Sequence, residues 1–301
     1  MALRRLTVPR DSPPRLDAFL ARALPSLPVA RIQQLLREGK VRVGGTKAKP
    51  LRRVRGGETV ELDLPPPRPV PRVDGPKLKA LYEDDALLVV DKPAGLVVEP
   101  GSDARSLVAV AATQFTGFDV GGLAAPGIAH RLDKETTGCL ALAKTDEALA
   151  ALRLAFEEKR VAKRYLALVV GAPPDEGAFD TPYAKHPGDP RRYTTRVESP
   201  RRARLRFTTR ERLGELALLD VELDTGRTHQ IRVQLSEAGY AVAGDSTYGQ
   251  PHALGDALGR VALHAARLRI EGVAVAPVDV EASLPADFAA LLDRLRRAVA
   301  R

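Results

Sequence analysis

The feature that most constrains the fold is a proline-rich segment in the first quarter of the chain. Residues 65–76 read Pro-Pro-Pro-Arg-Pro-Val-Pro-Arg-Val-Asp-Gly-Pro and contain six prolines. Because proline lacks a backbone N–H and fixes φ, such a segment joins neither a helix interior nor a central strand. It favours polyproline geometry, which rises about 3.1 Å per residue and here spans at most roughly 37 Å. The chain is therefore predicted to fold as residues 1–64, a linker over 65–77, and residues 78–301.

Charge divides the chain near the same place. Residues 1–72 hold 16 Lys and Arg against 6 Asp and Glu, a net charge of +10, whereas the whole chain carries +9. The remaining residues are therefore close to neutral. A compact basic part attached to a neutral body is typical of proteins that bind a polyanion, above all nucleic acid. A basic arm that only aids solubility is the alternative.

The basic part has the pattern of a small folded α/β module. Apolar residues recur at helical spacing in 14–24 and 28–38, and Gly39 is placed to end the second helix. Alternating segments predict strands at 40–43 and 58–64. Its candidate RNA contacts are Arg31, Arg37, Lys40, Arg42, Arg52 and Arg53. Aromatic residues are few here, so we expect contact with phosphates rather than base stacking.

Composition excludes several kinds of chemistry. Cys139 is the only cysteine and lies in an apolar run, so neither an intrachain disulfide nor a cysteine-based zinc site is expected. The five histidines show no metal-ligand spacing, and we predict no metal and no small-molecule cofactor. The N-terminus lacks an apolar signal core and no run of 18 apolar residues occurs, so we expect a cytoplasmic protein without a membrane span.

The larger part predicts an α+β fold with a mostly antiparallel mixed sheet and flanking helices. Strands are expected at 86–92, 163–170, 191–199, 203–212 and 216–223, and helices at 105–113, 145–160, 229–238 and 286–300. Thr145 and Thr228 are the expected N-caps of two of these helices. Arginines gather between 191 and 206, where the pattern fits a solvated sheet face as well as an RNA-contacting one.

One loop combines charge with the backbone signals of a functional site. Residues 127–138 read Gly-Ile-Ala-His-Arg-Leu-Asp-Lys-Glu-Thr-Thr-Gly, and the apolar run Cys-Leu-Ala-Leu-Ala follows at 139–143. A loop at the mouth of a strand aims its side chains while the strand holds it rigid. Asp133 has Arg131 nearby, and a neighbouring cation stabilises a carboxylate that must stay ionised where water is excluded. A turn or capping role for Asp133 is the alternative.

The whole string resembles the signature loop of the RluA-like family of RNA pseudouridine synthases. Three further segments match the family in order: Lys-Pro-Ala-Gly at 92–95, Lys-Arg-Tyr-Leu-Ala-Leu-Val at 163–169 and Gly-Arg-Thr-His-Gln-Ile-Arg at 226–232. The first of these is interpreted as one wall of the cleft or an ordinary strand-end turn. The segment Gly-Asp-Ser-Thr-Tyr-Gly at 244–249 also matches and is interpreted as scaffold.

The resemblance implies roles for five side chains. Asp133 is the nucleophile, and Arg232 pairs with it as a bidentate guanidinium. Tyr165 stacks on the extruded base and is a candidate acceptor for the proton of carbon 5. Arg131 fills the gap left by the base, and His130 is a candidate RNA contact with a plain turn role as its alternative. Whether the carboxylate attacks the anomeric carbon or the ring, or removes a ribose proton, stays open.

The implied activity is isomerisation of uridine to pseudouridine within structured RNA, without a cofactor. Residues 1–64 resemble the alpha-L RNA-binding domain named after a small-subunit ribosomal protein, through Arg-Leu-Asp at 15–17, Arg31 and Gly-Lys-Val-Arg-Val at 39–43. This combination implies large-subunit (23S) ribosomal RNA as substrate, with small-subunit RNA and tRNA as alternatives. We expect a monomer. Two rival classes are a non-catalytic assembly factor, which needs no matched catalytic motifs, and a metal-dependent nucleic-acid hydrolase, which needs clustered carboxylates.

Overall fold

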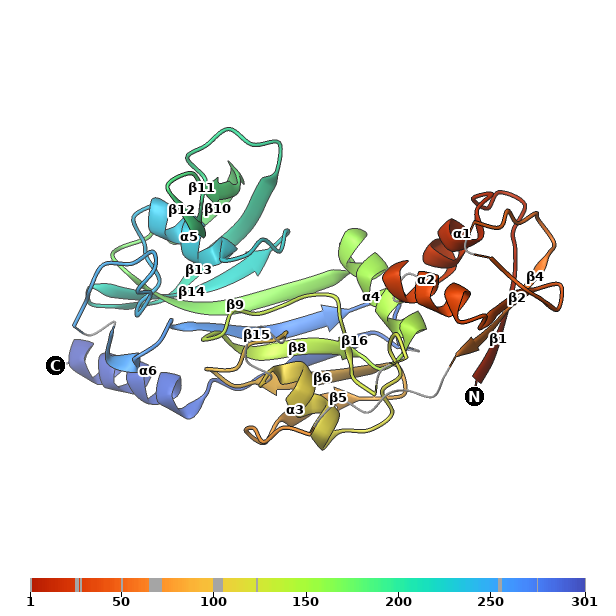
Figure 1. Cartoon of the computed structure of the whole chain (residues 1–301). Helices are drawn as coiled ribbons and strands as arrows, with labels where there is room; N and C mark the ends of the chain where they lie inside the picture. The colour runs from red at the N-terminus through yellow and green to blue at the C-terminus, as the bar shows by residue number, and fades with distance from the viewer. Residues whose placement is uncertain are drawn as a thin grey trace.

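The computed structural model describes residues 2–24, 27, 29–49, 51–64, 72–99, 105–122, 124–253, 256–274 and 276–300. The buried residues of the N-terminal quarter form a hydrophobic core of their own. Figure 1 shows this unit at one end of the molecule and the C-terminal helix at the other. In the part of the chain that is described, no helix is both long and apolar enough to cross a bilayer.

The N-terminal unit is a four-stranded sheet, in the order β1-β4-β2-β3, with two helices against it. Its elements are β1 (Ala2–Thr7), α1 (Leu16–Ala23), α2 (Val29–Arg37), β2 (Val41–Val43), β3 (Thr46–Lys47) and β4 (Thr59–Leu64). Leu20 of α1, Ile32 of α2 and Leu62 of β4 are fully buried, and each such burial contributes about 1.5–3 kcal/mol. Gly39 ends α2 with φ of 69°, a conformation that favours glycine. The elements predicted here are confirmed within two residues of their bounds.

The larger part is built on a ten-stranded sheet. Eight strands follow the order β10-β13-β14-β9-β15-β8-β6-β5, while β16 pairs with β15 and β7 pairs with β8. The strands are β5 (Lys79–Glu83), β6 (Leu87–Lys92), β7 (Gly127–Ile128), β8 (Thr137–Ala143), β9 (Val161–Val170), β10 (Glu176–Pro182), β13 (Arg202–Leu213), β14 (Leu216–Leu223), β15 (Leu263–Ile270) and β16 (Val278–Glu281). Strands β15 and β8 run parallel and the other pairs run antiparallel, which confirms the predicted α+β class with a mostly antiparallel mixed sheet.

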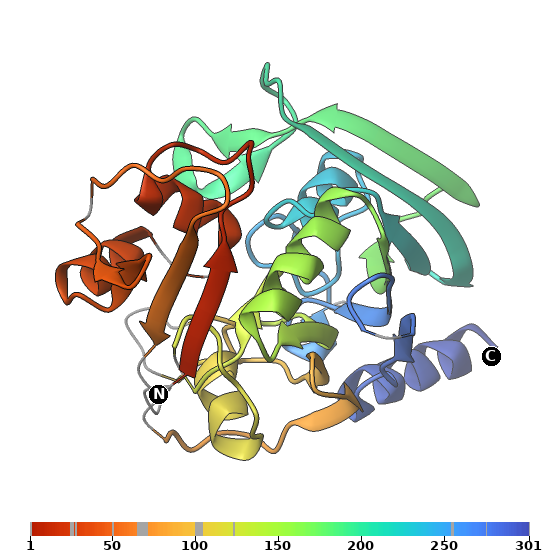
Figure 2. The same cartoon turned by 90° about the vertical axis from the view of Figure 1, so that its right-hand side faces the viewer.

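The central strands are buried on both faces. Every residue of β8 is buried, as its apolar sequence predicts. In β6, Leu88 and Val90 join one core while Leu87 and Val89 join another, as the two-residue period of a strand requires. Helices α3 (Leu107–Gln114) and α6 (Ala286–Val299) pack on the first core, and α4 (Asp146–Glu157) packs on the second. Figure 2 shows α4 crossing in front of the sheet.

Helix α5 (Gln230–Glu237) begins differently from its prediction. Thr228 is not its N-cap, because that position is held by His229, whose φ is 59° and whose side chain makes no capping bond. The carbonyl of Thr228 instead accepts the hydroxyl of Tyr183 at 2.6 Å. This tertiary contact fixes the turn before the helix, and a local pattern could not predict it.

The strand predicted at 191–199 is shorter and lies apart from the large sheet. It is β12 (Asp189–Thr194), which pairs with β11 (Ala184–His186) in a two-stranded sheet. Glu237 of α5 accepts hydrogen bonds from the hydroxyl of Thr194 at 2.6 Å and from the backbone N–H of Thr195 at 2.9 Å. These bonds turn the chain away from strand geometry after Thr194.

The proline-rich segment lies partly outside the described residues, which resume at position 72. Its C-terminal part rests on α3, because the side chain of Gln114 accepts from the N–H of Leu78 and donates to the carbonyl of Pro76, both at 2.8 Å. The end of this segment therefore packs with the larger part.

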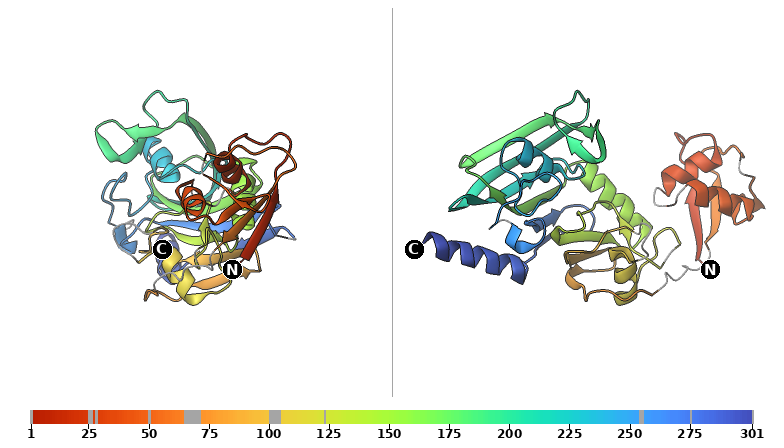
Figure 3. Two further views of the ribbon diagram at one scale, coloured as in Figure 1. Left: turned by 45° about the vertical axis from the view of Figure 1, so that its right-hand side comes forward. Right: turned by 60° about the vertical axis from the view of Figure 1, so that its left-hand side comes forward.

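An ion pair joins the two parts directly. Arg4 of β1 contacts Glu147, in the first turn of α4, at 2.9 Å. Figure 3 shows the N-terminal unit beside α4 from two further directions. The basic unit thus lies on the α4 side of the large sheet.

Candidate active site

The loop between β7 and β8 carries Asp133, whose side chain is half-buried. The N–H of Thr136 donates to the Asp133 carbonyl at 3.2 Å and closes a turn. Gly138, at the start of β8, has φ of 108°, and a Cβ atom there would lie 2.2 Å from the carbonyl oxygen of Ala265. Only glycine allows β15 to approach this loop so closely.

A fully buried lysine holds the loop from within. The ammonium of Lys92, at the end of β6, donates to the carbonyls of Pro93 (2.8 Å), Lys134 (2.9 Å) and Thr136 (2.9 Å). Burial lowers the pKa of Lys92 to about 8. Three donors matched to three acceptors satisfy the ammonium and the loop carbonyls together. The Lys-Pro-Ala-Gly segment therefore anchors the loop of Asp133.

Arg232 of α5 joins Asp133 to a second carboxylate. Its Nη1 donates to Oδ2 of Asp133 at 2.9 Å, while its Nε and Nη2 donate to Asp245 at 2.7 and 2.9 Å. Asp245 also accepts from the backbone N–H groups of Thr247 (2.9 Å) and Tyr248 (3.2 Å). The expected contact between Arg232 and Asp133 is present. The prediction that Arg232 binds Asp133 through two nitrogens was wrong, because its bidentate contact is with Asp245. A guanidinium fixed on one side directs the carboxylate on the other.

The charges of this pair are stabilised in buried surroundings. Burial acts to lower the pKa of Arg232, but the hydrogen bonds and charges of Asp245 and Asp133 outweigh burial and raise it. Burial acts to raise the pKa of Asp245, but its bonds to Arg232 and the charge of Arg232 outweigh burial and lower it. Both groups are therefore charged at neutral pH. The sequence analysis assigned the segment of Asp245 to scaffold, although its match to the family was the available signal.

His229 lies beside the carboxylate of Asp133. Its left-handed backbone is uncommon for a residue other than glycine, and such strain often marks a functional position. Its Nε2 is 3.9 Å from Oδ1 of Asp133, and its Nδ1 shares a hydrogen bond of 2.9 Å with the hydroxyl of Tyr248. Burial lowers the pKa of His229, although the charge of Asp133 opposes this. A neutral imidazole thus faces Asp133 at neutral pH, a neighbour that the sequence analysis missed.

Tyr165 and Asp133 line the same two recesses. The larger has a volume of about 690 Å³, and its other walls include His130, Arg131, Lys163 and Arg227. The smaller also reaches Arg232 and His229. Tyr165 is buried on β9, and burial raises its pKa above the ordinary value, with the charge of Asp133 adding to the effect. Tyr165 is therefore a neutral phenol at physiological pH, which suits an aromatic platform better than a base.

The two residues that precede Leu132 have different surroundings. The Nε2 of His130 accepts the backbone N–H of Ala141 at 2.9 Å, and its ring lies 4.8 Å from the ring of Phe156. Burial lowers the pKa of His130 to about 3. Arg131 is exposed and borders both recesses. His130 is thus tied to β8, while Arg131 is placed at the mouth of the site; their contacts with RNA stay predictions.

The predicted basic contacts of the N-terminal unit divide into two groups. The exposed ones are Arg37, Arg42 and Arg53. Lys40 and Arg52 are half-buried and form ion pairs of 3.0 Å with Asp63 and Glu58. The side chain of Arg31 lies outside what the structure describes. The exposed group makes no ion pair with the described residues and is therefore the better placed for phosphate contact.

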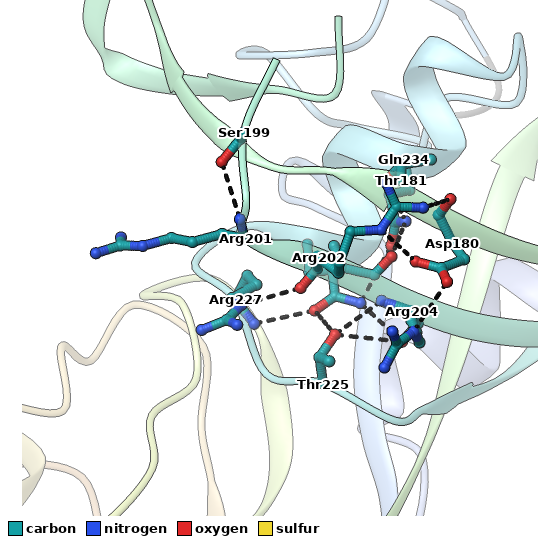
Figure 4. A network of polar contacts seen from close by, with 11 residues as sticks. Asp180, Thr181, Ser199, Arg201, Arg202, Arg204, Thr225, Arg227 and Gln234 are labelled. Carbon is teal, nitrogen blue, oxygen red and sulfur yellow. Dashed lines mark hydrogen bonds and ion pairs between the residues drawn. The ribbon is translucent and has the colours of Figure 1, made fainter. Parts of the chain in front are cut away.

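The arginines between 191 and 206 also divide. Arg202 and Arg204 donate to the two oxygens of Asp180 at 2.8 and 3.0 Å. Figure 4 shows these two converging on Asp180, whereas the side chains of Arg201 and Arg227 extend together to the other side. Arg201 is exposed, and its guanidinium makes no ion pair within the described ranges of the chain. Among the described residues, neither Arg201 nor Arg227 has a carboxylate partner.

Two family matches, together with the fold, assign the chain to a class of RNA-modifying enzymes. Residues 86–237 match the family described as RNA pseudouridylate synthase, and residues 14–60 match the S4 domain. The chain belongs to the RNA pseudouridine synthase family. It is therefore an isomerase that acts on RNA, with an RNA-binding S4 domain in front.

Relatives and solved structures match this chain over most of its length. The chain is 42% identical over 243 residues to an RNA pseudouridine synthase of Aquifex aeolicus, covering 78% of this chain and 77% of the relative. It is 35% identical over 320 residues to ribosomal large subunit pseudouridine synthase D of Xanthomonas campestris, covering 100% and 95%. The structure of human RNA pseudouridylate synthase domain containing 1 is similar with a TM-score of 0.61 at 25% identity, covering 74% and 95%.

Proposed function

We propose that this enzyme converts specific uridines of large-subunit ribosomal RNA to pseudouridine, with Asp133 as nucleophile and no cofactor. Relatives in Xanthomonas campestris and Nitrosomonas europaea that are named for the large ribosomal subunit are 35% and 36% identical to it. The observation that carries the proposal is Asp133 facing a recess, held by an Arg232 whose other side is fixed on Asp245.

The reaction exchanges one bond of the ribose for another. The bond from N1 of uracil to C1′ breaks, the base turns, and C1′ bonds to carbon 5. The hydrogen of carbon 5 leaves as a proton, and N1 takes up a proton. No electron is gained or lost, so the balance requires no oxidant. An oxygen of the Asp133 carboxylate bonds to C1′ as the bond to N1 breaks, and this ester bond breaks in turn when C1′ bonds to carbon 5, so the carboxylate is regenerated; carboxylates form such intermediates in glycosidases.

The surroundings of Asp133 suit a base taken out of its stack. A flipped base loses its stacked neighbours, and an aromatic face can replace them. Tyr165 is the aromatic side chain that lines both recesses with Asp133. Because its phenol is neutral, we assign stacking to Tyr165 and not proton removal. Arg131, at the mouth, is placed to occupy the gap in the RNA.

The test is release of tritium from RNA that carries tritium at carbon 5 of uracil. The substrates are unmodified transcripts of large-subunit ribosomal RNA and of tRNA, with EDTA present. Wild type should release tritium from the ribosomal transcript, and Asp133→Asn should be slower by at least about a thousandfold. Asp133→Asn should still bind within about threefold of the wild-type affinity.

Asp279→Asn is the matched control, because Asp279 lies on β16 and pairs with Arg267 outside both recesses. It should release tritium at the wild-type rate. Release by Asp133→Asn at a similar rate would contradict the nucleophile. Release from tRNA alone would contradict the proposed substrate.

A further inference from the structure

Lys163 is a cation in the catalytic recess to which no role has been given. It lies on β9 two residues before Tyr165, so both side chains are on the same face of the strand. Lys163 is half-buried and lines the larger recess together with Asp133 and Tyr165. Its position is fixed by the central sheet, because β9 is paired on both sides, with β14 and β15.

Among the described residues, the ammonium of Lys163 makes no hydrogen bond and no ion pair; the Asp224 carboxylate lines the same recess and attracts it only from a distance. Its Nζ lies over the ring of Phe156, 5.7 Å from the ring centroid. A cation–π contact at that distance is near the limit of its range and satisfies none of the three N–H donors. Burial lowers the pKa of Lys163 to about 8, and the charge of Asp224 opposes this only in part.

A partly desolvated cation without a partner is costly to the fold and is usually retained for a ligand. Enzymes of this family act on RNA, and the anionic groups of RNA are its phosphates. A strand rises about 3.3 Å per residue, so Lys163 lies about 7 Å along β9 from Tyr165. That is the scale of one nucleotide, with the base at Tyr165 and its backbone toward Lys163.

We propose that Lys163 binds a backbone phosphate next to the flipped uridine. The ammonium supplies a point charge and three donors to the phosphate oxygens, and the phosphate supplies a counter-ion in direct contact. This assignment rests on the proposed function, because it takes the target base to be the one stacked on Tyr165. Lys163 is a binding residue here and takes no part in the exchange of bonds at C1′.

The test compares Lys163→Met with Lys79→Met, both in the Asp133→Asn background so that the RNA is bound without turnover. Lys79 is an exposed lysine on β5 outside the recesses, so its loss controls for net charge. Affinity for an unmodified large-subunit ribosomal RNA transcript is measured between 50 and 200 mM KCl. Each phosphate contact contributes about 0.7 to 0.9 to the slope of log affinity against log salt.

Lys163→Met should reduce that slope by about 0.7 to 0.9 and weaken binding about tenfold at the lowest salt, whereas Lys79→Met should change neither. With Asp133 restored, Lys163→Met should raise KM about tenfold and leave kcat within about threefold. Its melting temperature should equal or exceed that of wild type, because an unpaired charge is removed.

An unchanged slope for Lys163→Met, or an equal loss for Lys79→Met, would overturn the phosphate assignment. A fall in kcat with unchanged KM and slope would also overturn it, since that result assigns Lys163 to the chemical step. Failure of the proposed function is a separate observation, namely no tritium release by wild type from the ribosomal transcript. The salt slope would still report whether Lys163 contacts phosphate.

Discussion

Asp245 accepts hydrogen bonds from Nε and Nη2 of Arg232, whose Nη1 donates to Asp133. The guanidinium cannot rotate without breaking two short charge-assisted hydrogen bonds. The direction of the Asp133 carboxylate is therefore set by Asp245, which is buried and lines neither of the two recesses beside Asp133. Asp245 acts through Arg232, as a positioning residue.

Asp245→Asn should lower turnover more than RNA binding. The amide keeps the shape but loses the charge, so Arg232 is released to move and Asp133 loses its alignment. We expect kcat to fall about a hundredfold. The free energy of unfolding should fall by about 3–5 kcal/mol, because one partner of a buried ion pair is lost. Tritium release and urea denaturation measure the two effects.

Asp279→Asn is the control for this prediction, because Asp279 pairs with Arg267 where both side chains are partly exposed. Its loss should lower the free energy of unfolding far less than Asp245→Asn does. Wild-type turnover by Asp245→Asn would show that Arg232 is held in place without it.

Lys92→Met should loosen the loop that carries Asp133. The carbonyls of Lys134 and Thr136 lose their donor in a buried place, at about 1–3 kcal/mol for each group left unsatisfied. We expect lower stability and a kcat loss larger than the change in RNA affinity, because Asp133 lies on the loop that is released. Lys79→Met, at an exposed position, should behave as wild type in the same denaturation and tritium assays. An unaltered kcat for Lys92→Met would show that turnover does not depend on the contacts of Lys92 with the loop.

His130 should contribute to acid sensitivity. Its pKa is lowered from 6.5 to about 3, so between these values the unfolded chain binds a proton that the folded chain does not. Stability therefore rises with pH through this window and is complete above pH 6.5. Going from pH 7 to pH 5 should cost at most about 2 kcal/mol from this group, since part of the ring borders the recess. In His130→Gln the fall in unfolding free energy should be smaller by that amount, and an equal fall would contradict this origin.

Arg201→Gln and Arg202→Gln form a matched pair for RNA binding. Arg202 already donates to Asp180, whereas Arg201 is exposed and extends on the same side as Arg227 (Figure 4). Loss of Arg201 should reduce the salt slope of RNA affinity by about 0.7 to 0.9. Loss of Arg202 should leave the slope nearly unchanged. A larger change in the salt slope for Arg202→Gln than for Arg201→Gln would mean that Arg202 leaves Asp180 and contacts the RNA.

Local sequence signals predicted those elements whose ends depend on one residue. Gly39 ends α2 in the left-handed conformation, and Thr145 caps α4 by accepting the N–H of Ala148 at 3.1 Å. The contact between Asp133 and Arg232 was also expected, although 99 positions separate them, because two motifs of one family supplied the pairing. Such cases need only near neighbours in the chain or a known family pattern.

The remaining features depend on contacts that a local pattern does not contain. His229 takes the N-cap of α5 because Tyr183 holds the carbonyl of Thr228. Lys92 was interpreted as part of a cleft wall or turn, yet its role follows from two carbonyls more than 40 positions away. The bidentate contact between Asp245 and Arg232 was missed for the same reason, because the local sequence around a buried charge does not identify its partner.

Strand β15 lies between β9 and β8 in the large sheet. Asp133 precedes β8 and Tyr165 lies on β9, so the two meet across a strand that the chain supplies more than 90 positions after Tyr165. During synthesis residues 263–270 must therefore leave the ribosome before the recess between Asp133 and Tyr165 can form. A nascent chain that already holds the segments of Asp133, Tyr165 and Arg232 but lacks this late strand has no such recess. The recess is completed only by a strand that follows all three of these residues in the chain.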